Sequence, residues 1–199
     1  MKRCPLSPKR SSIGGYTAME VVMSAGLFAV GATGVLAMQR GSISGNLRAH
    51  RVDVATSIAS TWIDRMRADA VLWTTPDAST TTGYKSRPLL KNVPASGSSS
   101  PWVLPTRTST NGSNPSFDLN GRELPTGAIG AENTEFCVEI RQTWIVPDRM
   151  MRADVRVYWP SGSSAAANSI ATAAGVCNAY TNADDYSSII SSSLIRGNF

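Results

Sequence analysis

The chain has 199 residues and a formal net charge of +5, which is long enough for one ordinary domain plus a membrane segment. Four of its 19 basic residues precede Gly15, where no acidic residue occurs, so the remainder holds 15 basic against 14 acidic side chains. The mature part is therefore nearly neutral, and its Lys and Arg residues do not form a cluster with aromatic residues between them. Both observations argue against a nucleic-acid-binding surface.

A long apolar run, Val21–Met38, follows this basic leader and is preceded by a single carboxylate, Glu20. About 18 to 23 such residues suffice to cross the hydrocarbon core of a bilayer as a helix. The leader's positive charge favours an N-terminus in the cytoplasm. A carboxylate inside a membrane helix is costly and is by default a functional residue. An uncleaved signal anchor, with Gly14–Gly15 as a flexible junction, is the alternative interpretation.

The junction Gly14-Gly15-Tyr16, with Glu20 and the apolar run behind it, resembles the class III signal of type IV pilins and type II secretion pseudopilins. The resemblance implies that a prepilin peptidase cleaves between Gly15 and Tyr16, removing residues 1–15, and that Tyr16 is N-methylated. It also implies that Glu20, the fifth mature residue, guides subunit assembly. The family usually has Phe in first place, and Tyr16 keeps the aromatic ring.

No proline occurs between Tyr16 and Trp73, and a helical pattern continues throughout. We expect a transmembrane and assembly part at 16–45 and an amphipathic part at 46–73. Small residues recur at steps of four in the first part: Ala25, Ala29, Thr33, Ala37, Gly41 and Gly45. They serve close packing against neighbouring helices or reflect chance in a segment rich in Ala and Gly.

The second part of the helix carries an apolar stripe that needs a sheet or another helix to cover it. The stripe consists of Ala55, Ala59, Ile63, Met66 and Ala70, with Leu47, Val54, Ile58 and Trp62 beside it. His50 is expected to face solvent. The run 63–69, with its Arg-Met-Arg sequence, resembles minor pilins of the PilV type and I-type minor pseudopilins. This second resemblance favours a minor subunit over the abundant fibre subunit.

Pro76 ends the helix, and residues 74–116 form a long segment rich in Ser, Thr, Pro, Gly and Asn. This segment is either a subunit-specific surface or loosely ordered filler. Within it, Trp102–Leu104 is expected to pack on the body or to form a short strand. Its hydroxyl-rich stretch at Thr80, Thr81 and Thr82 would belong to the binding surface if the body is a displayed adhesin.

Strand signals follow in the region 135–159. Residues 135–145 and 151–159 alternate apolar and polar side chains around a turn at 146–149, which predicts an antiparallel hairpin. Phe117–Leu119 is a candidate edge strand, and Tyr186–Ile195 is a last strand or an irregular cover. The expected fold is therefore α+β and pilin-like, with a long N-terminal helix packed on a small antiparallel sheet in a periplasmic domain at 74–199.

Two cysteines, Cys137 and Cys177, remain after the leader with Cys4 is removed. In an exported body a disulfide is the better interpretation, and closing that loop would stabilise the fold by about 4 kcal/mol. A metal site would need more ligands than are present. Calcium ligation by Asn178, Asn182, Asp184 and Asp185 is a weaker interpretation than a solvated loop.

No Ser/His/Asp arrangement and no phosphate-binding loop was found, so we expect a structural assembly protein without catalytic residues, metal or cofactor. The resemblance implies a minor pilin that primes or tips a type IV pilus. Its implied partners are other major and minor pilins, through the N-terminal helix, together with prepilin peptidase and the inner-membrane assembly platform. It would cross the inner membrane once before it enters the filament. The alternatives are a minor pseudopilin of a type II secretion system and a pilus-displayed adhesin.

Overall fold

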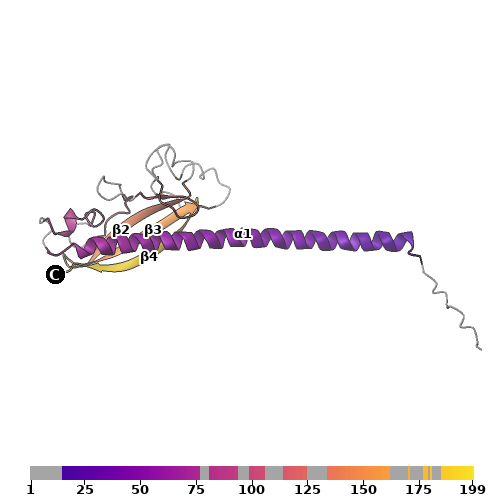
Figure 1. The fold of residues 1–199 in the computed structure, drawn as a ribbon, viewed down its shortest axis with the longest axis horizontal. Coiled ribbons are helices and arrows are strands. Elements are labelled where there is room, and N and C mark those ends of the chain that lie inside the picture. Colours follow the sequence, from indigo (N-terminus) through magenta and orange to yellow (C-terminus); the bar gives the residue numbers. More distant parts are fainter. Residues whose placement is uncertain are drawn as a thin grey trace, which may run out of the picture. The chain divides into compact units, whose positions relative to one another are not determined.

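The computed structural model describes residues 15–76, 81–93, 99–105, 114–124, 134–161, 170, 177–178, 180 and 185–199. The chain divides into two compact units, one ending at Leu47 and the other beginning at Arg48. One helix, α1 (Ala18–Val71), contributes residues to both units (Figure 1). The expected helix at 16–73 thus begins and ends two residues inside its predicted bounds.

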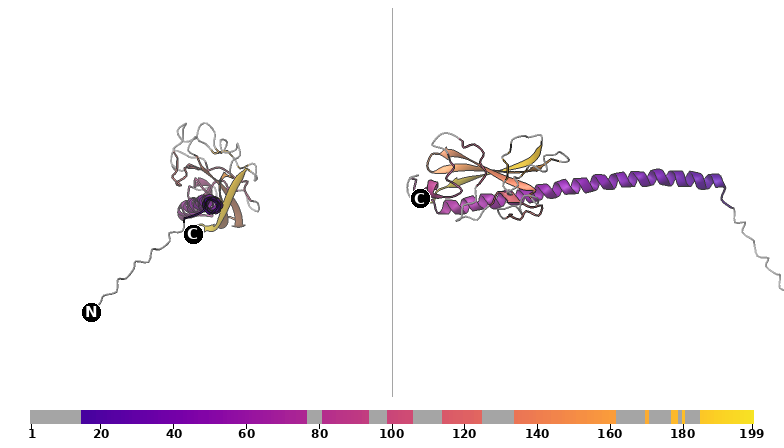
Figure 2. Two further views of the ribbon diagram at one scale, coloured as in Figure 1. Left: turned by 90° about the vertical axis from the view of Figure 1, so that its right-hand side faces the viewer. Right: turned by 90° about the horizontal axis from the view of Figure 1, so that it is seen from above.

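Within the described residues of the second unit, four strands form one antiparallel sheet in the order β1-β2-β3-β4 (Figures 1 and 2). The strands are β1 (Ser116–Phe117), β2 (Phe136–Val146), β3 (Met150–Pro160) and β4 (Tyr186–Arg196). A short 3-10 helix, η1 (Tyr84–Ser86), precedes them. The expectation of an α+β fold with a helix on a small antiparallel sheet is confirmed.

The predicted hairpin is formed by β2 and β3. Its register pairs Cys137 with Tyr158 and shifts only between Trp144 and Val146 near the turn. In the turn, Asp148 adopts a φ of 58°, and the N–H of Arg149 donates to the carbonyl of Val146 at 3.1 Å. Aspartate tolerates this left-handed conformation better than most residues, which explains why the turn sequence suits a tight reversal.

The C-terminal segment, for which the sequence allows either a last strand or an irregular cover, is a strand. β4 pairs with β3 along its whole length, from Pro160↔Tyr186 to Met150↔Arg196, without a register shift. At the opposite side of the sheet, the expected edge strand 117–119 is reduced to β1, which includes Phe117 but not Leu119. Val103 forms a single bridge with Ile140, so the stretch around Trp102 does pack on the body.

The core lies between one face of α1 and the inner face of the sheet (Figure 2). The helix contributes seven buried residues, namely Ala55, Ile58, Ala59, Trp62, Ile63, Met66 and Ala70. Alternate sheet residues meet them in the same cluster: Phe136, Val138, Ile140, Ala153, Val155 and Val157. The predicted stripe is confirmed over this range. Leu47, which we placed beside the stripe, is instead 58% exposed, because the buried face begins only at Ala55.

The end of α1 is fixed by an aromatic cluster. Trp73 makes edge contacts with Tyr84, Trp144 and Phe199 at ring-centroid distances of 5.7 to 5.9 Å. Its indole N–H donates to the carbonyl of Thr75 at 2.8 Å, so the polar edge of the buried ring is satisfied. The helix therefore ends two residues before Trp73, whose ring packs into the core.

Parts of the long segment 74–116 are packed on the body rather than loose. Leu90 and Val93 are buried in the core cluster, and the N–H of Leu89 donates to a carboxylate oxygen of Asp69 on α1 at 2.9 Å. The stretches 77–80, 94–98 and 106–113 lie outside the described residues, including Thr80 of the hydroxyl-rich stretch.

The predicted disulfide between Cys137 and Cys177 is present, with Cα atoms 5.8 Å apart. Both cysteines are buried in a second cluster with Tyr158, Ile170 and Tyr186. The bridge joins β2 to a segment 40 residues later in the chain. It therefore holds Cys177 against the sheet face opposite α1.

Replacing Met66 by Ala should destabilise the second unit by about 2 to 5 kcal/mol, because Met66 is fully buried between the helix and the sheet. The measurement is urea denaturation of the full chain in detergent micelles, followed by tryptophan fluorescence. Leu72→Ala is the matched control: Leu72 is 55% exposed, and its loss should change stability by less than about 0.5 kcal/mol. Equal effects of the two changes would contradict the assigned core.

Candidate functional site

The candidate assembly site is the first turn of α1, where the two residues of the proposed cleavage site precede the helix. Gly15 and Tyr16 are exposed, and Tyr16 retains 81% of its accessible surface. Thr17 caps the helix: its hydroxyl and its carbonyl both accept the N–H of Glu20, at 3.3 and 3.0 Å. Local chain geometry alone therefore brings Tyr16 and Glu20 onto one helix terminus.

Thr17 and Glu20 have the spacing of a capping box, in which an N-cap Thr is followed three residues later by Glu. This spacing is a local signal that can be seen in the sequence. A carboxylate here also interacts favourably with the positive end of the helix dipole. Glu20 thus helps to start the helix, and this structural role exists beside any role in assembly.

The helix behind Glu20 is apolar and open to its surroundings. No charged residue occurs between Glu20 and Arg40, and none of the most apolar stretch is buried. By length and composition, α1 is able to cross a membrane. The hydroxyls of Ser24, Thr33 and Ser44 donate to carbonyls within the helix at 2.8 to 2.9 Å. Such internal bonding is what a polar side chain requires in a lipid environment.

The small residues of this first part leave the helix surface uncovered. A Cβ atom added at the glycines of this helix would meet nothing within 4 Å, and the positions concerned are Gly26, Gly31, Gly34, Gly41 and Gly45. These glycines reduce helix propensity by about 1 kcal/mol each in water. Their open flanks allow close approach of another helix.

The outer face of the sheet carries a cluster of charged side chains, two of which are buried although the sequence predicts them to be exposed. Glu139 and Asp154 are 2% and 1% exposed, although the alternation of β2 and β3 assigns both to the polar face. Glu139 accepts bonds from Nε and Nη2 of Arg156 and from the N–H of Tyr180, the last at 2.8 Å. Asp154 receives Arg141 at 2.9 Å and Arg152 at 3.1 Å.

Two aromatic rings cover this cluster. The guanidinium carbon of Arg156 lies 4.2 Å from the ring centroids of both Trp102 and Tyr180, and that of Arg141 lies 4.6 Å from Trp102. Cation–π contacts of this kind stabilise by about 0.5 to 2 kcal/mol. The covering rings belong to segments distant in sequence, so the alternation of the strands alone carried no signal for the burial of Glu139 and Asp154.

Two pKa values in this region shift for identifiable reasons. Burial alone would raise the pKa of Asp154, but the Ser192 hydroxyl and the Arg141 and Arg152 guanidinium groups together hold it below its ordinary value. Burial, reinforced by the charge of Glu139, raises the pKa of the Tyr158 hydroxyl, which donates to the carbonyl of Asn178. At Asp154 the contacts with Ser192 and the two arginines thus more than offset the effect of burial on its pKa.

The other residues that could take part in catalysis or metal binding do not come together in one site among the described residues. His50 is exposed on α1 and lines an open hollow of about 400 Å³ with Asp53, Arg65 and Glu123. Among the described residues no group of three or more His, Cys, Asp or Glu side chains is placed to hold a metal ion. Of the weak calcium candidates, Asn178 and Asp185 are described, and Asn182 and Asp184 lie outside the described residues.

Comparisons with protein-family models, with curated proteins and with solved structures gave no match to this chain. The functional interpretation consequently depends on its residues and their geometry.

Replacing Asp154 by Asn should destabilise the protein by about 1 to 3 kcal/mol at pH 7, because three arginine contacts and the Ser192 bond lose their anion. A carboxylate with a lowered folded pKa stabilises above its ordinary value of 3.8 and loses that contribution as the pH falls through the lowered pKa. The difference from wild type should therefore shrink below about pH 3.8. Urea denaturation of the full chain at a series of pH values measures it.

Asp69→Asn is the control, because the pKa of Asp69 is shifted in the opposite direction from that of Asp154. Burial is the largest cause of the raised pKa of Asp69. The contribution of Asp69 is therefore fully present below pH 3.8 and declines as the pH rises through the raised pKa. Parallel pH profiles for the two variants would contradict these assignments.

Proposed function

We propose that this protein is a minor subunit of a type IV pilus, built into the filament through the N-terminal part of α1. The observation that carries the proposal is the first part of the helix. It is apolar, has no buried residue, and bears one carboxylate in its first turn directly after the Gly15–Tyr16 junction. A helix with these properties suits extraction from a membrane into a bundle of like helices.

The proposed role of Glu20 follows from its electrostatics. Within the described residues its carboxylate has no hydrogen bond or ion pair from another side chain, and in lipid an unpaired charge is strongly disfavoured. Cleavage after Gly15 would create an ammonium group on Tyr16. Glu20 of one subunit and the Tyr16 ammonium of another are opposite charges in a medium of low dielectric constant, so their pairing would set the axial register between subunits.

Two features support a single-pass subunit with an exported body. The disulfide joins the only two cysteines that follow the proposed cleavage site, and structural disulfides persist in oxidising compartments. The leader's basic residues favour a cytoplasmic N-terminus. In the proposed order of events, the chain is inserted in the inner membrane, is cleaved and methylated by prepilin peptidase, and then joins other pilins at the assembly platform.

The minor role, rather than that of the abundant fibre subunit, is supported by the Arg-Met-Arg run at 65–67. In the structure Met66 is buried, Arg65 pairs with Glu123 at 2.8 Å, and Arg67 donates to the Ser193 hydroxyl of β4 at 2.8 Å. The run therefore attaches the helix to the body by core packing and by two polar contacts.

Replacing Glu20 by Ala should leave cleavage intact and reduce the amount of this subunit in sheared filaments about tenfold or more, because the register-setting charge pair is lost. Immunoblots of membrane and filament fractions measure both quantities. Gly15→Val is the matched comparison. It should accumulate an uncleaved precursor that is heavier by the leader and remains in the membrane. Wild-type incorporation of the Glu20→Ala chain would remove the proposed role of Glu20, and wild-type mobility of the Gly15→Val chain would refute the cleavage site.

Deletion of the gene should strongly reduce surface filaments, because a priming subunit is required before the abundant subunit polymerises. Filaments are counted by electron microscopy, with secreted enzyme activity and surface attachment scored in the same cells. Normal filaments with lost secretion would indicate a minor pseudopilin of a type II secretion system instead. Normal filaments that fail to attach would indicate a displayed adhesin, whose surface would include the exposed Thr81.

A further inference from the structure

The two edges of the sheet differ in how they are protected. On the β2 side, the edge is covered by β1 and by single bridges from Ser99 to Thr143 and from Val103 to Ile140. On the other side, β4 pairs only with β3, and among the described residues no strand lies on its outer edge (Figures 1 and 2). Every second residue of β4 therefore turns its backbone N–H and C=O away from the sheet.

β4 also lacks the features that usually prevent pairing at an edge. Proteins protect edge strands with short length, proline, bulges or charged side chains. β4 has 11 residues, pairs in continuous register and contains no proline. Its one charged residue, Arg196, is at its C-terminal end. Ile190 and Leu194 lie on its outer face and are 57% and 60% exposed. Such an edge is ready to accept a further strand.

Two hollows between β4 and α1 indicate what that strand should carry. One, of about 530 Å³, lies at the start of β4 and is lined by Ser187 and Ile189 and by Arg48 and Arg51 of the helix. The other, of about 350 Å³, lies at the end of β4 beside Ile195, Arg196 and Arg67. The described residues that line them include no aspartate or glutamate. Each hollow therefore offers a positively charged wall without a built-in anion.

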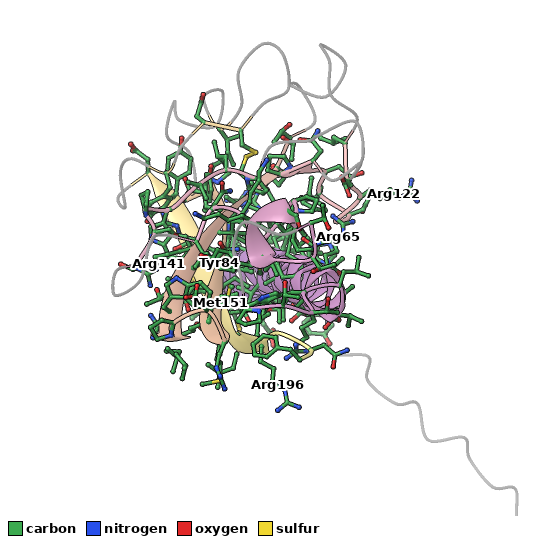
Figure 3. All side chains as sticks on the ribbon, turned by 90° about the vertical axis from the view of Figure 1, so that its left-hand side faces the viewer. Arg65, Tyr84, Arg122, Arg141, Met151 and Arg196 are labelled. Atoms are coloured by element: carbon green, nitrogen blue, oxygen red, sulfur yellow. A yellow bond between two sulfur atoms is a disulfide. The ribbon has the colours of Figure 1, made fainter. Side chains whose placement is uncertain are left out.

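The arginines of the two hollows are unequally engaged. Arg51 pairs with Glu135 at 2.7 Å. Arg67 pairs with the exposed Asp64 at 3.2 Å and donates to the Ser193 hydroxyl of β4 at 2.8 Å. Arg48 and Arg196 make no ion pair among the described residues, and Figure 3 shows the Arg196 side chain directed away from the body. One uncommitted cation thus stands at each end of the uncharged strand.

We propose that the free edge of β4 binds an extended segment of a partner protein as a fifth strand, and that this segment carries two carboxylates about seven residues apart, on opposite faces of the strand. The spacing follows from the positions of the two arginines. Arg48 lines the hollow beside Ile189, on the face toward α1. Arg196 follows the buried Ile195 and therefore lies on the opposite face, with Ile190 and Leu194, about seven positions after Ile189. On the opposite face the added strand places apolar side chains beside Ile190 and Leu194. Main-chain bonds supply affinity, and the charged positions supply specificity.

This surface does not depend on the proposed pilus role, since it lies on the second unit and requires neither cleavage nor Glu20. The probe that tests it is the peptide Glu-Thr-Val-Thr-Val-Thr-Val-Glu-Val, with blocked ends, added to the full chain in detergent micelles. In antiparallel pairing its first glutamate lies beside Arg196 and its second beside Ile189, on the side of Arg48. Its partner probe has lysine in place of both glutamates. Binding is measured by fluorescence anisotropy, and the position of binding by amide hydrogen exchange.

We expect the glutamate peptide to slow exchange in β4 and to bind about tenfold or more tightly than the lysine peptide. In the variant Arg48→Glu with Arg196→Glu this preference should reverse. The charge-matched control, Lys91→Glu with Arg122→Glu, changes two exposed cations away from β4 and should keep the wild-type preference.

Three results would overturn the proposal: no binding of the glutamate peptide, equal binding of both peptides, or protection outside β4. A fourth would replace the proposed partner. If β4 becomes protected in the absence of peptide as the protein concentration rises, the occupant is a second copy of this chain and not an acidic segment of another protein.

Discussion

The burial of one face of α1, from Ala55 to Ala70, is the constraint on which the second unit depends. Trp62 and Met66 fill the space against which Val155 and Val157 of β3 pack, so neither helix nor sheet could shield its apolar face from water alone. Each such side chain stabilises by about 1.5 to 3 kcal/mol when fully buried. The isolated helix has no comparable source of stability, since helix propensity alone is marginal in water.

This packing determines the chemistry of the opposite sheet face. Because side chains alternate along a strand, filling the inner face with Val155 and Val157 directs Asp154 and Arg156 outward. Trp102, Tyr180 and the disulfide-bonded Cys177 then cover part of that outer face. A charge removed from water in this way must be paired, and breaking such a pair is more costly than never forming it. The matched arginines and carboxylates are thus a consequence of covering a two-sided sheet.

The parts of the fold that repeat along the sequence were predictable, and those that depend on long-range contacts were not. The helix, its buried stripe and the β2–β3 hairpin follow from local periodicity, and their bounds agree with the structure to within about two residues. β4 was ambiguous because its alternation of Ile and Ser is imperfect, and pairing with β3 decided its conformation. The burial of Glu139 and Asp154 had no local signal, since the covering rings are contributed from elsewhere in the chain.

The same distinction applies to the candidate assembly site. The junction at Gly15 and Tyr16 and the carboxylate of Glu20 can be identified in the sequence, because the signal consists of adjacent residues in a fixed order. The structure adds that Thr17 caps the helix at Glu20. What the local chain cannot provide is the partner of the Glu20 carboxylate, since that partner is proposed to belong to another subunit.

The two proposed contact surfaces use different forces but share one physical requirement. Apolar side chains attract without direction, so the first part of α1 could slide along a neighbouring helix with little change in buried area. An edge strand fixes direction through its backbone bonds, yet a shift of two residues preserves both the bonding pattern and the faces. In each case an otherwise uncharged surface leaves several registers nearly equal in energy. In the two proposed contacts, a few isolated charges would remove that degeneracy: Glu20 at the start of the apolar helix, and Arg48 and Arg196 at the two ends of β4. Charges placed so sparsely contribute little to total affinity, and their value lies in the registers that they exclude.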